Sequence, residues 1–374
     1  MLNLRTILLP AIAVAAITAS AQNPTTLKDA YKGSFYIGAA INTAQATGAD
    51  ARGATIVKEQ FDSISPENDL KWERIHPKPD TYTFELADKY VEFGEKNHMF
   101  IVGHNLVWHA QVPAWVFQDA DGKPITRDAL LKRLHDHIFT VVGRYKGRIQ
   151  SWDVVNEALN EDGTLRQSKW MQIIGEDYIL KAYQWAHEAD PQAQLNYNDY
   201  SIENEPKRNG AIALIKKLQS QGVNVAVVGV QGHDSLDWPS AQLEEDSIMA
   251  FAKLGVKVAI TELDIDVLPP IDPGSADVSL SVKGNPKLNP YANGLPDSVQ
   301  KELAEKYASL FAVYLKHRDV MSRVTLWGVT DANSWRNNWP VVGRTSYPLL
   351  FDRAGKPKPA FDAVVQLPRQ VAKP

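Results

Sequence analysis

The chain has 374 residues, of which 44% are hydrophobic and 22% charged, a composition typical of a folded globular protein. Its net charge of -4 provides no basic field for nucleic acid or anionic lipid, so a neutral partner is favoured. The absence of cysteine excludes disulfides, thiol nucleophiles and cysteine-based metal sites.

The N-terminus has the pattern of a secretory signal. Arg5 precedes an apolar run over residues 7–17, and Ala19-Ser20-Ala21 has the small-x-small form of a cleavage site. An anchor helix is the alternative, but the run is shorter than the roughly 20 apolar residues that cross a bilayer. We expect a signal peptide over residues 1–21, a mature chain over 22–374, and secretion to the periplasm or the medium without membrane attachment.

Short β-like runs alternate with helix-like segments along the mature chain. The predicted strands span residues 35–41, 61–65, 99–103, 149–155, 193–197, 225–230, 257–261 and 323–329. Eight repeats of strand and helix, with no glycine-rich phosphate loop after the first strand, favour an α/β fold, a single-domain (β/α)8 TIM barrel, over a doubly wound sheet.

Two helices have recognisable starts. Thr126 is a predicted N-cap, because Leu130, Leu134 and later apolar residues follow at helical spacing. Asp297 is a predicted N-cap for a helix over residues 297–317. Before that helix, residues 268–296 form a long predicted loop, which in a barrel lies either beside the site or as an inert surface insertion.

Two glutamates stand where predicted strands run out. Glu157 closes the run 151–157 and Glu262 lies in the run 258–264. The C-terminal ends of barrel strands converge on one face, so the two carboxyl groups are expected to face each other. Paired carboxyl groups of this kind hydrolyse glycosidic bonds, with retention at about 5–5.5 Å separation and inversion at about 6.5–9.5 Å. The alternative for either glutamate is an ion pair at a strand end.

From residue 36 to residue 361 the chain resembles glycoside hydrolase family ten, the endo-β-1,4-xylanases. The resemblance rests on ENDLKW (67–72), HNLVWH (104–109), WDVVNEA (152–158), NDY (198–200), QGH (231–233), TELD (261–264) and WGVTD (327–331). It implies that residues 22–374 form one catalytic barrel that needs no cofactor and acts, as a monomer, on xylan and xylo-oligosaccharides.

The resemblance also implies roles for individual residues. Glu157 would be the general acid/base and Glu262 the nucleophile of a retaining double displacement. Asn156 would bind the sugar 2-hydroxyl, His233 would orient Glu262, and Asp264 would be a further supporting residue of catalysis.

Further residues of these motifs are suited to a sugar cleft. Amide and charged side chains can read hydroxyl pairs, and tryptophan faces can stack on pyranose rings. The predicted substrate-binding residues are Glu67, Asn68, Lys71, His104, Trp108, Gln111, Tyr200, Gln231, Trp327 and Trp335. Packing in the core is the alternative for each tryptophan, most of all for Trp108, and Tyr200 is expected on the aglycone side.

No metal site is expected. His104 and His109 could be ligands, but they lack the i, i+4 helical spacing of zinc hydrolases and a third ligand. Asp266 is predicted to serve a loop.

Three functions therefore stand at the level of sequence. The first is an endo-β-1,4-xylanase, the second a β-glucanase or an exo-acting xylosidase on the same barrel. The third is a carbohydrate-binding protein without turnover.

Overall fold

The computed structural model describes residues 26–271, 282–284 and 286–371. The predicted signal peptide, residues 1–21, lies outside them, as does part of the predicted loop 268–296.

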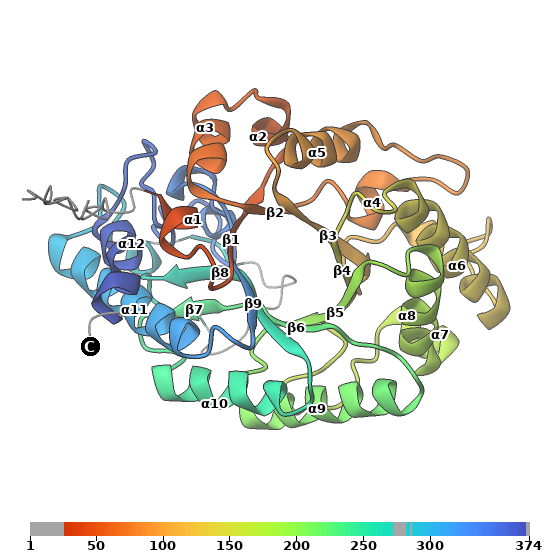
Figure 1. Cartoon of the computed structure of the whole chain (residues 1–374). Coiled ribbons are helices and arrows are strands. Elements are labelled where there is room, and N and C mark those ends of the chain that lie inside the picture. Colours follow the sequence, from red (N-terminus) through yellow and green to blue (C-terminus); the bar gives the residue numbers. More distant parts are fainter. Residues whose placement is uncertain (1–25, 272–281, 285, 372–374) are drawn as a thin grey trace, which may run out of the picture.

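Eight parallel strands close into a barrel (Figure 1). They are β1 (Tyr36–Ile41), β2 (Ser63–Pro66), β3 (Phe100–Val107), β4 (Ser151–Asn156), β5 (Gln194–Asp199), β6 (Val227–Val230), β8 (Lys257–Asp266) and β9 (Met321–Leu326). Each pairs with the next, β6 pairs with β8, and β9 returns to β1. The short β7 (His233–Ser235) adds to the far end of β8. The predicted barrel and its eight strands are confirmed.

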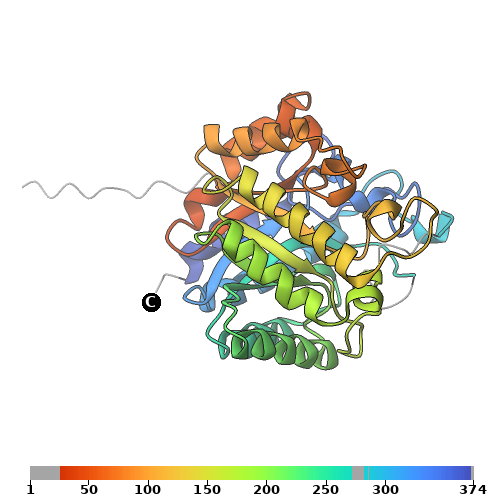
Figure 2. The same ribbon diagram turned by 90° about the vertical axis from the view of Figure 1, so that its right-hand side faces the viewer.

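Helices surround the strands on the outside, as Figures 1 and 2 show. They are α1 (Leu27–Ala30), α2 (Thr43–Thr47), α3 (Ala51–Gln60), α4 (Trp72–Ile75), α5 (Glu85–Lys96), α6 (Arg127–Arg144), α7 (Lys169–Ile174), α8 (Asp177–Ala189), α9 (Glu205–Ser220), α10 (Ala241–Ala252), α11 (Asp297–Lys316) and α12 (Pro359–Val371). None of the helices in the described residues is long and apolar enough to cross a membrane.

The two predicted helix starts differ in outcome. The Thr126 hydroxyl accepts the Ala129 N–H and caps α6, as predicted. For α11 the predicted cap is wrong by one residue: Pro296 is the N-cap and makes no side-chain bond, while Asp297 is the first helical residue. Its carboxylate there lies in the first turn, where the helix dipole favours negative charge.

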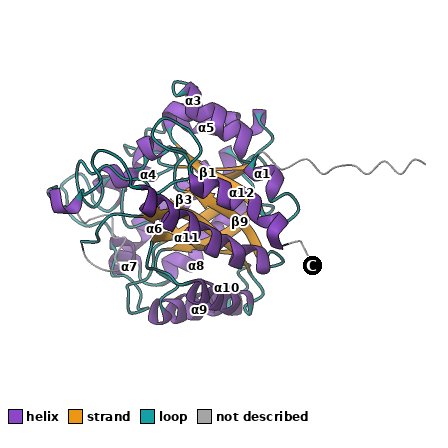
Figure 3. Cartoon of the chain, turned by 90° about the vertical axis from the view of Figure 1, so that its left-hand side faces the viewer, coloured by secondary structure: helices purple, strands orange, loops and turns teal. Residues whose placement is uncertain are grey.

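The two ends of the described chain meet. The hydroxyl of Tyr31, just after α1, donates to the Val364 carbonyl in α12 at 2.9 Å. Figure 3 shows α1, α11 and α12 on the same side of the barrel. This contact joins the last helix to the first and completes the outer ring.

Several strands are longer than predicted at their C-terminal ends. β3 continues to Val107, β5 to Asp199 and β8 to Asp266, so His104 and Glu262 lie within strands rather than after them. The sequence prediction ended these strands where polar residues interrupt the apolar pattern. In the structure those polar residues pair with one another, and the hydrogen bonding between strands continues past them. The β3–β4 register shifts between His104 and Val107, and the β8–β9 register between Ile260 and Leu263. Bulges of this kind often aim side chains at active sites.

Candidate active site

Glu157 follows β4 directly, and its carboxyl group is buried, at 5% exposure. Its backbone is left-handed, with φ at 57°, which is uncommon for a residue other than glycine. Oε2 accepts the Trp108 indole N–H at 2.7 Å. Oε1 accepts N–H groups of Gln231 at 3.1 Å and Asn156 at 3.3 Å. Three donors therefore hold the carboxyl group in one orientation.

Three effects favour the protonated form of Glu157. Burial and the negative charges of Asp199 and Glu262 raise its pKa to about 6, although hydrogen bonds from Trp108 and Gln231 oppose the rise. A carboxyl group with this pKa can hold and release a proton near neutral pH, which is the requirement for a general acid/base.

Glu262, in β8, is held by different partners. The Asn198 amide donates to Oε1 at 2.8 Å, and His233 Nε2 lies 3.3 Å from Oε2. Burial opposes the charged form of His233, but the charge of Asp264 and the contacts with both acids raise its pKa to about 9. An imidazolium and an amide thus orient the carboxylate of Glu262.

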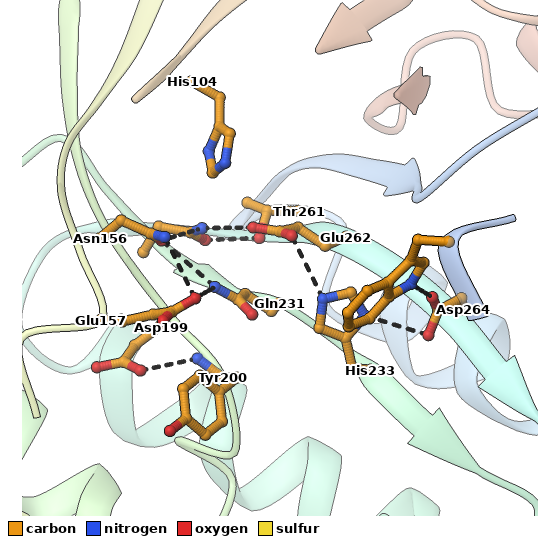
Figure 4. A network of polar contacts seen from close by, with 12 residues as sticks. His104, Asn156, Glu157, Asp199, Tyr200, Gln231, His233, Thr261, Glu262 and Asp264 are labelled. Atoms are coloured by element: carbon orange, nitrogen blue, oxygen red, sulfur yellow. Dashed lines mark hydrogen bonds and ion pairs between the residues drawn. The ribbon is translucent and has the colours of Figure 1, made fainter. Parts of the chain in front are cut away.

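Amide side chains connect the two glutamates (Figure 4). Asn198 donates from one nitrogen to Glu262 and to Asn156 Oδ1, the latter at 2.9 Å. Asn156 in turn donates to Glu157. The Thr261 hydroxyl donates to Asn198 Oδ1 at 2.6 Å and fixes which way that amide points. The two carboxyl groups are therefore positioned relative to each other by one bonded chain across the barrel mouth.

Asp264 joins His233 to the wall of the site. Its Oδ1 lies 3.1 Å from His233 Nδ1 and accepts Arg336 Nε at 2.7 Å, while Oδ2 accepts the Trp335 indole N–H at 2.6 Å. Burial opposes ionisation, yet the charges of Arg336 and His233 lower the pKa of Asp264 to about 2. Asp264 therefore stays ionised and couples the histidine to Trp335.

A cleft of about 450 Å³ opens beside this centre, and Glu67, Asn68 and Trp335 are among its lining residues. Lys71 Nζ donates to Asn68 Oδ1 at 3.1 Å and lies 4.9 Å from the centre of the Trp108 ring.

Lys71 is buried, which lowers its pKa, although the charges of Glu262, Glu67 and Glu157 oppose this. Gln111 donates to Asn68 at 3.4 Å and to Glu73 at 2.9 Å. Four of the predicted substrate-binding residues thus form one polar wall.

His104 and Trp327 lie on another side of the mouth. His104 Nδ1 is 3.0 Å from Asp153 Oδ2, and its ring meets the Trp327 ring edge-on at 5.4 Å. The ring centre of His233 lies 6.3 Å from the ring centre of the same tryptophan. Within the described ranges, no group of three acidic, histidine or cysteine residues could hold a metal ion.

Tyr200 lies past β5, near Glu157 and Asp199 in Figure 4. Its hydroxyl accepts an Arg166 N–H at 2.8 Å, and Lys207 Nζ lies 3.3 Å from its ring centre. The ring is 3% exposed, so it is packed and bonded before any ligand arrives.

Some residues of the site had no predicted role. Asn198 and Thr261 stood inside quoted motifs, which was the available signal, whereas Arg166 and Arg336 stood in none. The loop role predicted for Asp266 is confirmed: it ends β8, and its Oδ1 accepts the Leu268 N–H, two residues on, at 3.0 Å. Its Oδ2 also accepts from Arg336 at 3.3 Å and Arg344 at 2.8 Å, which the sequence did not predict. Two arginines from the segment 336–344 thus form ion pairs with its carboxylate.

Comparisons with known proteins agree with this geometry. The model of glycosyl hydrolase family 10 matches residues 26–367. Endo-1,4-beta-xylanase A of Xylanibacter ruminicola is 45% identical over 352 residues, covering 94% of this chain and 95% of the relative. Beta-1,4-xylanase of Dictyoglomus thermophilum is 43% identical, covering 91% and 90%.

A solved structure shares the same architecture. It is a GH10 endoxylanase retrieved from a sugarcane soil metagenome, 49% identical, with a TM-score of 0.89, and the match covers 91% of this chain and 99% of that one. The family match spans nearly the whole described chain, and the motifs that carry it surround the two glutamates. The chain belongs to glycosyl hydrolase family 10.

Proposed function

We propose that this protein hydrolyses internal β-1,4-xylosidic bonds of xylan with retention of configuration. One observation carries the proposal: a buried carboxyl group with a raised pKa, Glu157, is linked by amides to a second carboxylate, Glu262, that an imidazolium orients. The xylanase names of the relatives support the choice of substrate.

In the first step, the Glu262 carboxylate attacks the anomeric carbon while Glu157 donates its proton to the departing oxygen. A covalent glycosyl-enzyme forms and the aglycone leaves. In the second step, Glu157 accepts a proton from water, and that water displaces Glu262 with a second inversion. Asn156 is placed between both acids, where its amide can bind the sugar 2-hydroxyl as charge develops.

The polar wall and the tryptophans are proposed to hold xylan and xylo-oligosaccharides. Glu67, Asn68, Lys71 and Gln111 offer hydrogen bonds along the cleft, with His104 and Gln231 nearer the reacting bond. Trp327 and Trp335 would stack on the glycone sugars, and Tyr200 would meet the aglycone. Trp108 acts in this scheme mainly through its hydrogen bond to Glu157.

Initial rates on xylan, a cellulosic polymer and an aryl xyloside test this proposal. We expect the highest kcat/KM on xylan, with products from internal cleavage of xylohexaose. A preference for the cellulosic polymer, or release of single xylose units from one end, would favour the second function. Tight xylo-oligosaccharide binding with no products would favour the binding protein.

We also propose that residues 1–21 direct secretion and that the mature chain, 22–374, acts as a monomer. The N-terminal sequence of the exported protein should begin at Gln22, and light scattering should give the mass of one chain. An N-terminus at Met1 on an exported, membrane-bound protein would instead support an anchor.

A further inference from the structure

The main chain of Glu157 is held from both sides. Its left-handed φ of 57° turns the side chain out of the alternation that β4 would impose. The Glu157 N–H donates to the Asn198 carbonyl at 2.9 Å. The Glu157 carbonyl accepts Arg166 Nε at 3.1 Å. Because a residue other than glycine adopts this conformation at a free-energy penalty, these two bonds help to keep it.

Arg166 is itself firmly placed. Its N–H donates to the Ala158 carbonyl at 2.8 Å, so the chain after Glu157 folds back on itself. Leu159 and Leu165 pair within this turn as an antiparallel bridge. The guanidinium is thereby brought back against the residue that begins the turn.

The same guanidinium also contacts the residue that follows the next strand, β5. Nη2 donates to the Tyr200 hydroxyl at 2.8 Å and, more weakly, to the Leu159 carbonyl at 3.4 Å. One planar side chain therefore bonds the Glu157 main chain through Nε and a residue beyond β5 through Nη2. Burial opposes its charge, but Tyr200, Glu157 and Asp199 raise the pKa of Arg166.

We propose that Arg166 is a positioning residue for proton transfer: by fixing the Glu157 main chain against Tyr200, it aims the carboxyl group at the departing oxygen. This inference rests on the proposed acid/base role of Glu157. Arg166 touches neither the sugar nor the reacting atoms in this scheme, and it acts on proton transfer through the orientation of Glu157.

A purely structural role would weaken every reaction alike, whereas a role in aiming the acid would not. A leaving group that departs readily needs little help from an acid, and a poor one needs all of it. General acid catalysis contributes roughly 10²–10⁴-fold, so a misaligned acid loses part of that factor only on poor leaving groups.

The test measures kcat/KM for the full mature chain on aryl β-xylobiosides whose phenols range from very acidic to weakly acidic. The variants are Arg166→Met and Arg166→Lys. Arg133→Met is the matched control, because Arg133 is also half-buried and donates to main-chain carbonyls, those of Val116 at 3.2 Å and Gln118 at 3.0 Å, away from the glutamates.

We expect Arg166→Met to lose about 10-fold or more in kcat/KM on the poorest leaving group relative to the best. Arg166→Lys should lose selectively too, because an ammonium keeps the charge but cannot make both bonds with fork geometry. Arg133→Met should lose equally across the series, whatever its melting temperature. Equal losses across the series for both Arg166 variants would overturn the proposal.

Glu157→Ala, measured alone and with Arg166→Met, separates this inference from the proposed function. If Glu157→Ala itself shows no leaving-group selectivity, the acid/base assignment fails first. If it does, adding Arg166→Met should produce no further selective loss. A further selective loss in the double variant would show that Arg166 acts by another route and would also overturn the inference.

Discussion

Replacing Trp108 with phenylalanine should move the alkaline limb of the pH–activity profile to higher pH. The Trp108 N–H donates to Glu157 at 2.7 Å, and this bond lowers the pKa of Glu157 against burial. A hydrogen bond contributes about 1.5–3 kcal/mol to a charged acceptor and about 0.5–1.5 to a neutral one. The difference, about 1–1.5 kcal/mol, corresponds to about one pKa unit.

The assay is kcat/KM against pH on an aryl xylobioside with a poor leaving group. If Glu157 is the acid, rates should fall at alkaline pH as it loses its proton, with the midpoint near the pKa of about 6. Trp108→Phe should move that midpoint to about 7. Loss of a sugar contact would scale the whole curve without moving the midpoint.

Trp115→Phe is the control, because the Trp115 N–H donates to the Pro77 carbonyl at 3.1 Å instead. A midpoint for Trp108→Phe that stays at the wild-type pH, or falls below it, would refute the reasoning.

Three further outcomes are expected. Glu262→Ala should abolish turnover, and azide should restore it with a glycosyl azide of inverted configuration, seen by NMR; an azide product of retained configuration would contradict the nucleophile. His137 is buried with Nδ1 3.2 Å from His76 Nδ1, and burial and the charge of His76 lower its pKa. Neutral His137 therefore costs the fold nothing above the unfolded pKa of about 6.5, and the free energy of unfolding falls as pH drops below that value. In chemical unfolding between about pH 6.5 and 5, His137→Phe should make this fall shallower, and an unchanged slope would contradict the assignment. Lys358 and Asp331 form a buried ion pair at 2.9 Å, so Lys358→Met should lower the free energy of unfolding by about 3–5 kcal/mol, and a change below about 1 kcal/mol would show that the pair is not needed.

The barrel and its two central glutamates were predictable because local patterns carry them. Apolar runs at regular intervals marked the strands, and the motifs around Glu157 and Glu262 are contiguous in sequence. The strand ends were harder to predict. His104 and Asp264 look like loop residues in an apolar pattern, yet they pair with Asp153 and Arg336, and the strands continue through them.

The supporting contacts could not be read from local patterns. Arg166 donates to a main-chain carbonyl, and a bond of this kind requires no particular residue type or spacing in the sequence. Arg336 and Arg344 lie 70 and 78 residues after Asp266 in the sequence, so no local pattern links them to it. Trp108 was expected to bind sugar or fill the core, and its bond to Glu157 depends on an indole orientation that only the folded chain defines.

Proton NMR of xylohexaose hydrolysis in D₂O tests the central claim most directly, because it shows which anomer forms before mutarotation. If Glu262 is the nucleophile and Glu157 the acid/base, the β-anomer should appear first, together with products of internal cleavage. The α-anomer appearing first would contradict the double displacement.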